Sequence, residues 1–150
     1  MLLGSRRFPV ELDSVTKAVE FIVSSCQSSG VELHCLPRLL LACDELITNI
    51  FYHGCHDTDQ DPFVDVAIHL ESDFLSVRIE DNTRPFTPQS LPPRCNFGSS
   101  AQSIGTGGLG IYLVFQVLDC FEHHEENNKN VNILKISASG TANPAHIRKT

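Results

Sequence analysis

Apolar residues recur every three or four positions in two stretches of the chain, residues 14–28 and 36–53. This spacing places them on one side of an α-helix and predicts two amphipathic helices. Asp13 or Ser14 can cap the first helix, because short polar side chains satisfy free backbone N–H groups there. Gly54 is suited to end the second helix in a left-handed conformation.

Several segments outside the two predicted helices have patterns typical of β-strands. Residues 6–12 are expected to form a short edge strand, where proline is tolerated. Alternating apolar and polar residues predict strands at 63–71 and 74–81, with further strands near 119–125 and 131–138. These elements predict an α+β fold, a two-layer α/β sandwich whose mixed, mostly antiparallel sheet carries its helices on one face.

A long polar segment, residues 82–107, is rich in Pro, Gly, Ser, Asn and Thr. Loops of this length inside a compact domain are uncommon and usually functional. A helical pattern returns from Gly108. We expect residues 1–150 to form a single domain, with its core at about 6–138 and a tail at 139–150.

Composition narrows the possible functions. The 150 residues suit one domain, and 18 acidic against 11 basic residues give a net charge of −7. That charge argues against binding to nucleic acid or to an anionic membrane surface. There is no apolar run of about 18 residues, as a membrane span requires. Arg6 and Arg7 follow the short apolar N-terminus rather than precede it, unlike a signal peptide. We therefore expect a cytoplasmic protein.

Cysteine is frequent, but its spacing does not indicate a metal site. The six residues are Cys26, Cys35, Cys43, Cys55, Cys95 and Cys120. They never form a CxxC pair, and several lie within apolar patterns, where cysteine behaves as a small hydrophobe. A metal site could be built from His53, Cys55 and His56, or from His34 and Cys35. Neither group is accompanied by a second pair of ligands at zinc-finger spacing. Free thiols in a reducing compartment are the favoured interpretation.

The second predicted helix carries a candidate reactive pair. Glu45 and Asn49 are one turn apart, opposite an apolar face made of Leu39, Cys43, Leu46, Ile47 and Ile50. Spacing alone favours a solvent-exposed face for the pair. Asparagine, however, prefers helix caps to helix interiors. A carboxylate and an amide oxygen can together accept a proton and ligate a hard cation.

Asp81 continues the alternation of Leu75, Val77 and Ile79, so its carboxylate is expected to point with the buried side chains. Burial of an unpaired carboxylate is costly. Asp81 therefore either starts a turn, as aspartate often does, or accepts a hydrogen bond from a ligand amino group such as that of adenine.

The segment 105–110, Gly-Thr-Gly-Gly-Leu-Gly, precedes an apolar helical run. Glycines at a helix start let backbone amides approach phosphate oxygens. The segment spells GxGxxG, but it follows a long polar loop instead of a strand, so it does not fit a dinucleotide-binding fold. It also lacks the Lys-Ser/Thr of a Walker loop. A flexible, glycine-rich helix entry is the alternative.

Together, the order and spacing of these motifs resemble those of the GHKL (Bergerat-fold) ATP-binding domains. The nearest likeness is to the small bacterial anti-sigma factor serine/threonine kinases of partner-switching systems, over about residues 6–138. The family's Glu-x-x-x-Asn-x-x-x-His-Gly motif is matched by Glu45, Asn49, His53 and Gly54. Its Asp-x-Gly-x-Pro-Phe motif is matched by Asp81, Pro85 and Phe86, with Thr83 in the place of glycine. Its Gly-x-Gly-Gly-Leu-Gly motif is matched by residues 105–110.

The resemblance implies roles for these residues. Glu45 would be the general base, Asn49 the Mg²⁺ ligand and Asp81 the adenine acceptor. An ATP lid would span about 82–107. The implied nucleotide-binding residues are Asn49, His53, Asp81, Pro85, Phe86, Gly105, Thr106, Gly107, Gly108, Leu109 and Gly110. A side chain at Thr83 could crowd the adenine, and Asn132 is a candidate on the adenine side near the last strand.

The implied function is that of an anti-sigma factor kinase. It would use ATP and Mg²⁺ to phosphorylate a Ser or Thr of a small anti-anti-sigma (antagonist) protein, and would sequester a sigma factor or similar regulator as a homodimer. The alternative is a non-catalytic Bergerat-fold module that acts only by sequestering partners, with nucleotide binding weakened or lost through Thr83. A sensor histidine kinase is disfavoured because no dimerisation helix with a phospho-accepting His precedes the domain in this sequence.

Overall fold

The computed structural model describes residues 1–30, 34–54, 61–84 and 117–138. Within these residues the chain forms two helices and five strands. Their bounds are β1 Leu2–Pro9, α1 Ser14–Ser28, α2 Leu36–Gly54, β2 Phe63–Glu71, β3 Phe74–Asp81, β4 Cys120–Glu126 and β5 Lys129–Ser137. The helix expected from Gly108 lies outside this part of the chain.

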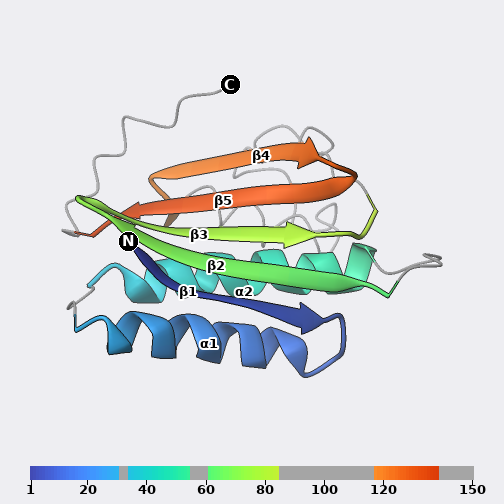
Figure 1. Ribbon diagram of the computed structural model, residues 1–150, viewed down its shortest axis with the longest axis horizontal. Coiled ribbons are helices and arrows are strands. Elements are labelled where there is room, and N and C mark those ends of the chain that lie inside the picture. Colours follow the sequence, from blue (N-terminus) through green and yellow to red (C-terminus); the bar gives the residue numbers. More distant parts are fainter. Residues whose placement is uncertain (31–33, 55–60, 85–116, 139–150) are drawn as a thin grey trace, which may run out of the picture.

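The strands form one sheet in the order β1-β2-β3-β5-β4, and every described pair is antiparallel. Both helices lie against the same face of the sheet, so the described chain has two layers (Figure 1). The predicted α+β sandwich with helices on one face is therefore confirmed. The parallel pairing that a mixed sheet would contain does not occur among these strands.

The core lies between the helices and the facing side of the sheet. Every second residue of the central strands belongs to it, namely Val64, Val66, Ile68, Leu75, Val77, Ile79, Leu134 and Ile136. The helices contribute Ala18, Ile22, Cys26, Leu39, Ala42, Cys43, Leu46, Ile47 and Ile50. The alternation arises because successive strand side chains point to opposite faces. The five apolar positions predicted for the second helix are all buried.

The buried thiols behave as small hydrophobes. Cys26, Cys35 and Cys43 are buried, reduced members of the core. Burial raises the pKa of Cys26 to about 11 and raises the pKa of Cys43 as well. Neutral thiols are poor nucleophiles, so these side chains fill space. Cys55 and Cys95 lie outside the described residues.

The strand β1 is Leu2–Pro9, so the predicted span of 6–12 was wrong at both ends. The strand pairs with β2 along this length, with Phe8 opposite Val64. Of its eight residues only Phe8 is buried. A sheet edge with so little alternation leaves almost no hydrophobic pattern from which its bounds could be predicted.

The start of α1 differs from the prediction in its capping. Asp13 occupies the N-cap position but makes no side-chain capping hydrogen bond. Its carboxylate instead forms an ion pair with Lys17, one turn along the helix. The hydroxyl of Ser14 is buried and has no hydrogen-bond partner, so neither expected residue caps the helix.

A two-residue turn joins β4 to β5. Asn127 and Asn128 both have positive φ, 51° and 60°. A two-residue hairpin loop with positive φ at both residues matches the twist of antiparallel strands, and asparagine adopts positive φ more readily than most residues. Because the turn is so short, β5 begins at Lys129, two residues before its predicted start.

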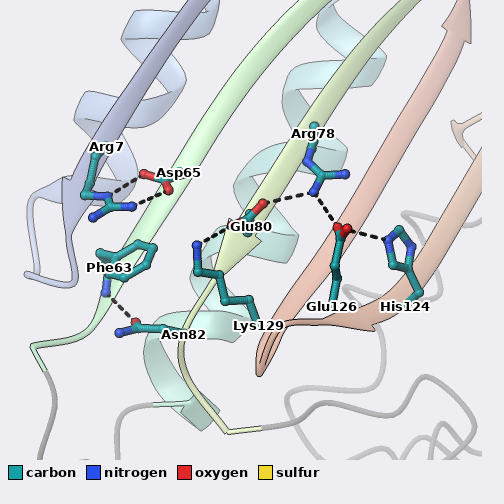
Figure 2. Close-up of polar contacts among 9 residues, drawn as sticks. All are labelled: Arg7, Phe63, Asp65, Arg78, Glu80, Asn82, His124, Glu126 and Lys129. Atoms are coloured by element: carbon teal, nitrogen blue, oxygen red, sulfur yellow. Dashed lines mark hydrogen bonds and ion pairs between the residues drawn. The ribbon is translucent and has the colours of Figure 1, made fainter.

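The sheet face away from the helices carries ion pairs. Arg7 of β1 binds Asp65 of β2 through two nitrogen–oxygen contacts of 2.7 Å, and its guanidinium lies 3.7 Å from the ring centroid of Phe63 (Figure 2). Bidentate geometry and stacking on an aromatic ring are the contacts that guanidinium makes best. These contacts link the edge strand to its neighbour.

Further ion pairs cross the centre of the same face. Glu80 of β3 accepts from Lys129 at 2.7 Å and from Arg78 at 3.0 Å, and Arg78 also donates to Glu126 at 3.1 Å (Figure 2). The hydrogen bond from Lys129, followed by that from Arg78, lowers the pKa of Glu80. The network makes this part of the face polar, whereas the opposite face of the sheet packs against both helices.

Within the described residues, neither helix combines the length and apolar character that crossing a membrane would require.

Leu39→Ala should lower the free energy of unfolding by about 2–5 kcal/mol, because Leu39 is 0 % exposed and its loss leaves a cavity. Leu41 on the same helix is 43 % exposed, so Leu41→Ala should cost about 1 kcal/mol or less. Urea unfolding followed by circular dichroism measures both. Equal losses for the two variants would contradict the assigned helix face.

Glu80→Gln should destabilise the protein at neutral pH and much less in acid. The ordinary pKa of Glu80 is 4.5 and the folded pKa is lower. The stabilisation by the ionised group is therefore fully present above about pH 4.5 and is lost as pH falls through the lowered value. Unfolding free energies of wild type and variant across this range test it. In a Lys129→Met background the effect of Glu80→Gln should shrink; an undiminished effect would contradict the assigned cause.

Candidate functional site

The polar centre of the helix-facing side is Asp81, the last residue of β3. It is 0 % exposed, so the predicted burial of its carboxylate is confirmed. The sheet register places it between Val64 of β2 and Asn130 of β5. An ionisable group at this depth requires hydrogen-bond donors to offset its lost hydration.

The two oxygens of Asp81 have different surroundings. Oδ1 accepts from the backbone N–H of Thr83 at 3.0 Å, from the Thr83 hydroxyl at 2.5 Å and from Nδ2 of Asn130 at 2.9 Å. Oδ2 is buried and has no hydrogen-bond partner within the part of the chain that the structure describes. Leaving a buried charged acceptor without a donor costs about 1–3 kcal/mol or more. The site therefore presents one unfilled acceptor to any donor that enters.

The chain that follows β3 is held to both neighbouring strands. The amide of Asn130 also donates to the Arg84 carbonyl at 3.0 Å, which joins this turn to β5. Asn82 accepts from the backbone N–H of Phe63 at 2.8 Å (Figure 2). It also donates to the Asp61 carbonyl at 3.1 Å, so both contacts join it to the start of β2. These contacts restrict the conformation of the chain around Asp81.

Thr83, which stands where the Asp-x-Gly-x-Pro-Phe motif has glycine, is part of this arrangement. It is only 6 % exposed. Its hydroxyl points to Asp81 and donates to Oδ1. The side chain therefore makes a specific contact with the acceptor that the sequence predicted to be functional.

The residues of the helix pair lie one turn apart on α2, as the spacing predicted. Glu45 and Asn49 are both half-buried, so they do not lie on the solvent-exposed face that spacing alone favoured. The Asn49 side-chain nitrogen is buried and has no hydrogen-bond partner among the described residues. Tyr52, which flanks the pair, is 67 % exposed. The helix thus holds a carboxylate beside an amide whose nitrogen makes no hydrogen bond to the described residues.

Asn130 is the residue that the sequence did not single out. The candidate there was Asn132, but Oδ1 of Asn132 lies 2.7 Å from Nδ1 of His123, and Asn132 pairs with Ile79 in the register. Both asparagines have the same strand parity, so alternation could not separate them. The register between β3 and β5 decides between them, because it pairs Asn130 with Asp81.

Several predicted site residues lie outside the described part of the chain. They are Pro85, Phe86, Gly105, Thr106, Gly107, Gly108, Leu109 and Gly110, together with most of the predicted lid at 82–107. His53 lies within α2, but its side chain is also outside the described set. Their roles stay predictions.

Comparison with known proteins identifies the family and similar proteins. Residues 8–136 match the model of a family described as a histidine kinase-like ATPase domain. The chain is 32 % identical over 83 residues to a probable C4-dicarboxylate sensor kinase of Bacillus subtilis (strain 168), covering 54 % of this chain and 15 % of that protein. It is 30 % identical over 95 residues to the serine-protein kinase RsbW of Listeria innocua serovar 6a, covering 61 % and 59 %. The match thus spans less than two thirds of either relative.

A solved structure with a similar fold is the histidine kinase domain from Erythrobacter litoralis EL346 blue-light activated histidine kinase. The TM-score is 0.51 at 20 % sequence identity, covering 76 % of this chain and 50 % of that one. At this identity the likeness concerns the fold alone. It supports the two-layer arrangement of sheet and helices.

Asn130→Ala should lower the free energy of unfolding by about 1–3 kcal/mol, because the Asp81 carboxylate and the Arg84 carbonyl each lose a donor. Asn130→Asp should cost more, since it sets a second carboxylate against the first. Gln27→Ala, which removes an exposed amide from α1, is the control and should stay within about 0.5 kcal/mol of wild type. Urea unfolding is the measurement. An Asn130→Ala variant as stable as the control would contradict the assigned contacts.

Proposed function

The chain belongs to the family of histidine kinase-like ATPase domains, and on this premise we propose that it is an ATP-dependent protein serine/threonine kinase. Its substrate would be a small antagonist protein of the anti-anti-sigma type. It would also sequester a sigma factor or similar regulator, acting as a cytoplasmic homodimer. The similarity to the serine-protein kinase RsbW over 95 residues supports the serine/threonine assignment.

The observation that carries the proposal is the unfilled acceptor on Asp81. Oδ2 is buried without a donor, while Oδ1 is already used by Thr83 and Asn130. An exocyclic amine such as that of adenine is a neutral donor that would satisfy Oδ2. A hydrogen bond to a buried charged acceptor is both strong and selective.

The helix pair fits a site for Mg²⁺ held mainly by a nucleotide. No three His, Cys, Asp or Glu side chains gather into a metal site in the described ranges. Mg²⁺ with nucleotides commonly takes its oxygens from phosphates, water and only one or two side chains. The amide of Asn49 would supply one such oxygen. The ion, when bound, would neutralise charge on the phosphates.

Glu45 is the proposed general base. It lies one turn before Asn49 on the same face of α2 and is half-buried. A carboxylate there would accept the proton of the attacking Ser or Thr hydroxyl as the phosphoryl group is transferred. Orientation of the two reactants would supply much of the remaining acceleration, as in other phosphoryl transfers.

Glu45→Gln should lower phosphoryl transfer to an antagonist protein by roughly 10²–10⁴-fold while ATP still binds. Asn49→Ala should weaken Mg²⁺-dependent ATP binding, because one of the oxygens proposed to ligate the ion is lost. Asp44→Asn is the matched control, since Asp44 is the exposed neighbouring carboxylate on α2. It should transfer at the wild-type rate. Radiolabelled Mg-ATP with candidate antagonists, followed by an acid wash, measures the acid-stable phosphoester.

Three results would each contradict a different part of the proposal. Full transfer by Glu45→Gln would remove the assigned base. An acid-labile product would indicate phosphohistidine instead of phosphoserine. Mg²⁺-dependent ATP binding without transfer to any antagonist would favour a binding module that acts only by sequestering partners.

A further inference from the structure

Oδ1 of Asp81 accepts from three donors, two of which come from Thr83. A carboxylate oxygen has about two lone-pair directions, so these donors fill Oδ1. Oδ2 receives none, although it is equally buried. The local contacts therefore make the two oxygens of one carboxylate unequal.

The hydroxyl of Thr83 is the contact that another residue at this position would lack. Glycine, the residue of the resembling motif, would supply the backbone N–H alone. Threonine adds an O–H from the same residue, and Asn130 adds an N–H from the neighbouring strand. Donors from two directions resist rotation of the carboxylate, so its plane is set before any ligand arrives.

We infer that Thr83 is a positioning residue whose hydroxyl fixes the orientation of the Asp81 carboxylate and so sharpens the selectivity of this site for a 6-aminopurine nucleotide. This rests on the proposed function, because it concerns the same nucleotide site. With Oδ1 filled, Oδ2 is the acceptor that faces the ligand, and it can only accept. A 6-amino group donates to it, a hydrogen at that carbon does not, and a 6-oxo group would set two acceptors against each other. Sites built to hydrogen-bond a ligand group reject analogues that lack it.

A positioning role of Thr83 and a purely structural role would affect nucleotide binding differently. Loss of the hydroxyl leaves Oδ1 with the donors from the Thr83 backbone and from Asn130, but removes one of the three contacts that hold the plane of the carboxylate. The carboxylate can then rotate more freely to suit other ligands. Discrimination against the analogue without the amine should therefore fall more than overall binding does. A merely structural residue would weaken all nucleotides alike.

The test compares equilibrium binding of ATP, purine riboside 5′-triphosphate and inosine triphosphate to the full chain with Mg²⁺. Wild type should bind ATP roughly tenfold or more tightly than the purine riboside analogue. Thr83→Val keeps the shape but removes the hydroxyl, and should reduce that ratio about threefold or more. Thr83→Ser restores the hydroxyl and should keep the ratio within about twofold of wild type.

Ser76→Ala is the matched control, since it removes a buried hydroxyl from the opposite face of β3 and should leave the ratio unchanged. If Thr83→Val does not fold, Thr83→Gly and Thr83→Ala also remove the hydroxyl. An unchanged ratio in the hydroxyl-free variants, with ATP still bound, would overturn the inference alone. Failure of wild type to bind ATP would overturn the proposed nucleotide site together with it.

Discussion

The described structure depends on the separation of the sheet into one apolar and one charged face. The apolar side chains of β2, β3 and β5 pack against α1 and α2, and burial of this surface is the main favourable term in folding. The other face carries the network of Arg78, Glu80, Glu126 and Lys129. Helices could not cover those charges without dehydrating them, which would be costly.

Asp81 is the exception on the apolar face. Along β3 it follows Val77 and Ile79 on the same side of the strand, and all three are buried, but Asp81 carries a carboxylate. Three donors offset its burial at one oxygen, and the other oxygen has none. A buried polar atom without a partner is costly to stability and needs a physical explanation, and a role in ligand binding is one such explanation. The end of β3 thus joins the packing of the fold to its proposed chemistry.

The cysteines and the buried asparagines show how context changes the same residue type. Cys26 and Cys43 lie in the hydrophobic core, where burial keeps them as neutral thiols. Asn130 and Asn132 are buried to the same degree on one face of β5, but one contacts Asp81 and the other contacts His123. Chemistry in this domain is set by the neighbour that each side chain meets.

Local periodicity determined much of this protein from its sequence. The helix at 14–28, the helix ending at Gly54 and the strands at 63–71 and 74–81 all lie where the apolar spacing predicted them. The burial of Asp81 and the pairing of Glu45 with Asn49 along one helix face followed from the same spacing. These features depend only on residues near each other in the chain, so a single segment contains the information for them.

Tertiary structure decided the features that join distant segments. The edge strand β1 has almost no pattern of its own, and its length is set by pairing with β2. The choice of Asn130 over Asn132 depends on strand register, which brings together Asp81 and a residue 49 positions away. The contact of the Thr83 hydroxyl with Oδ1 likewise needed the folded turn. Hydrogen bonds require atoms to meet within a few tenths of an ångström, and residue spacing alone does not specify distances between segments.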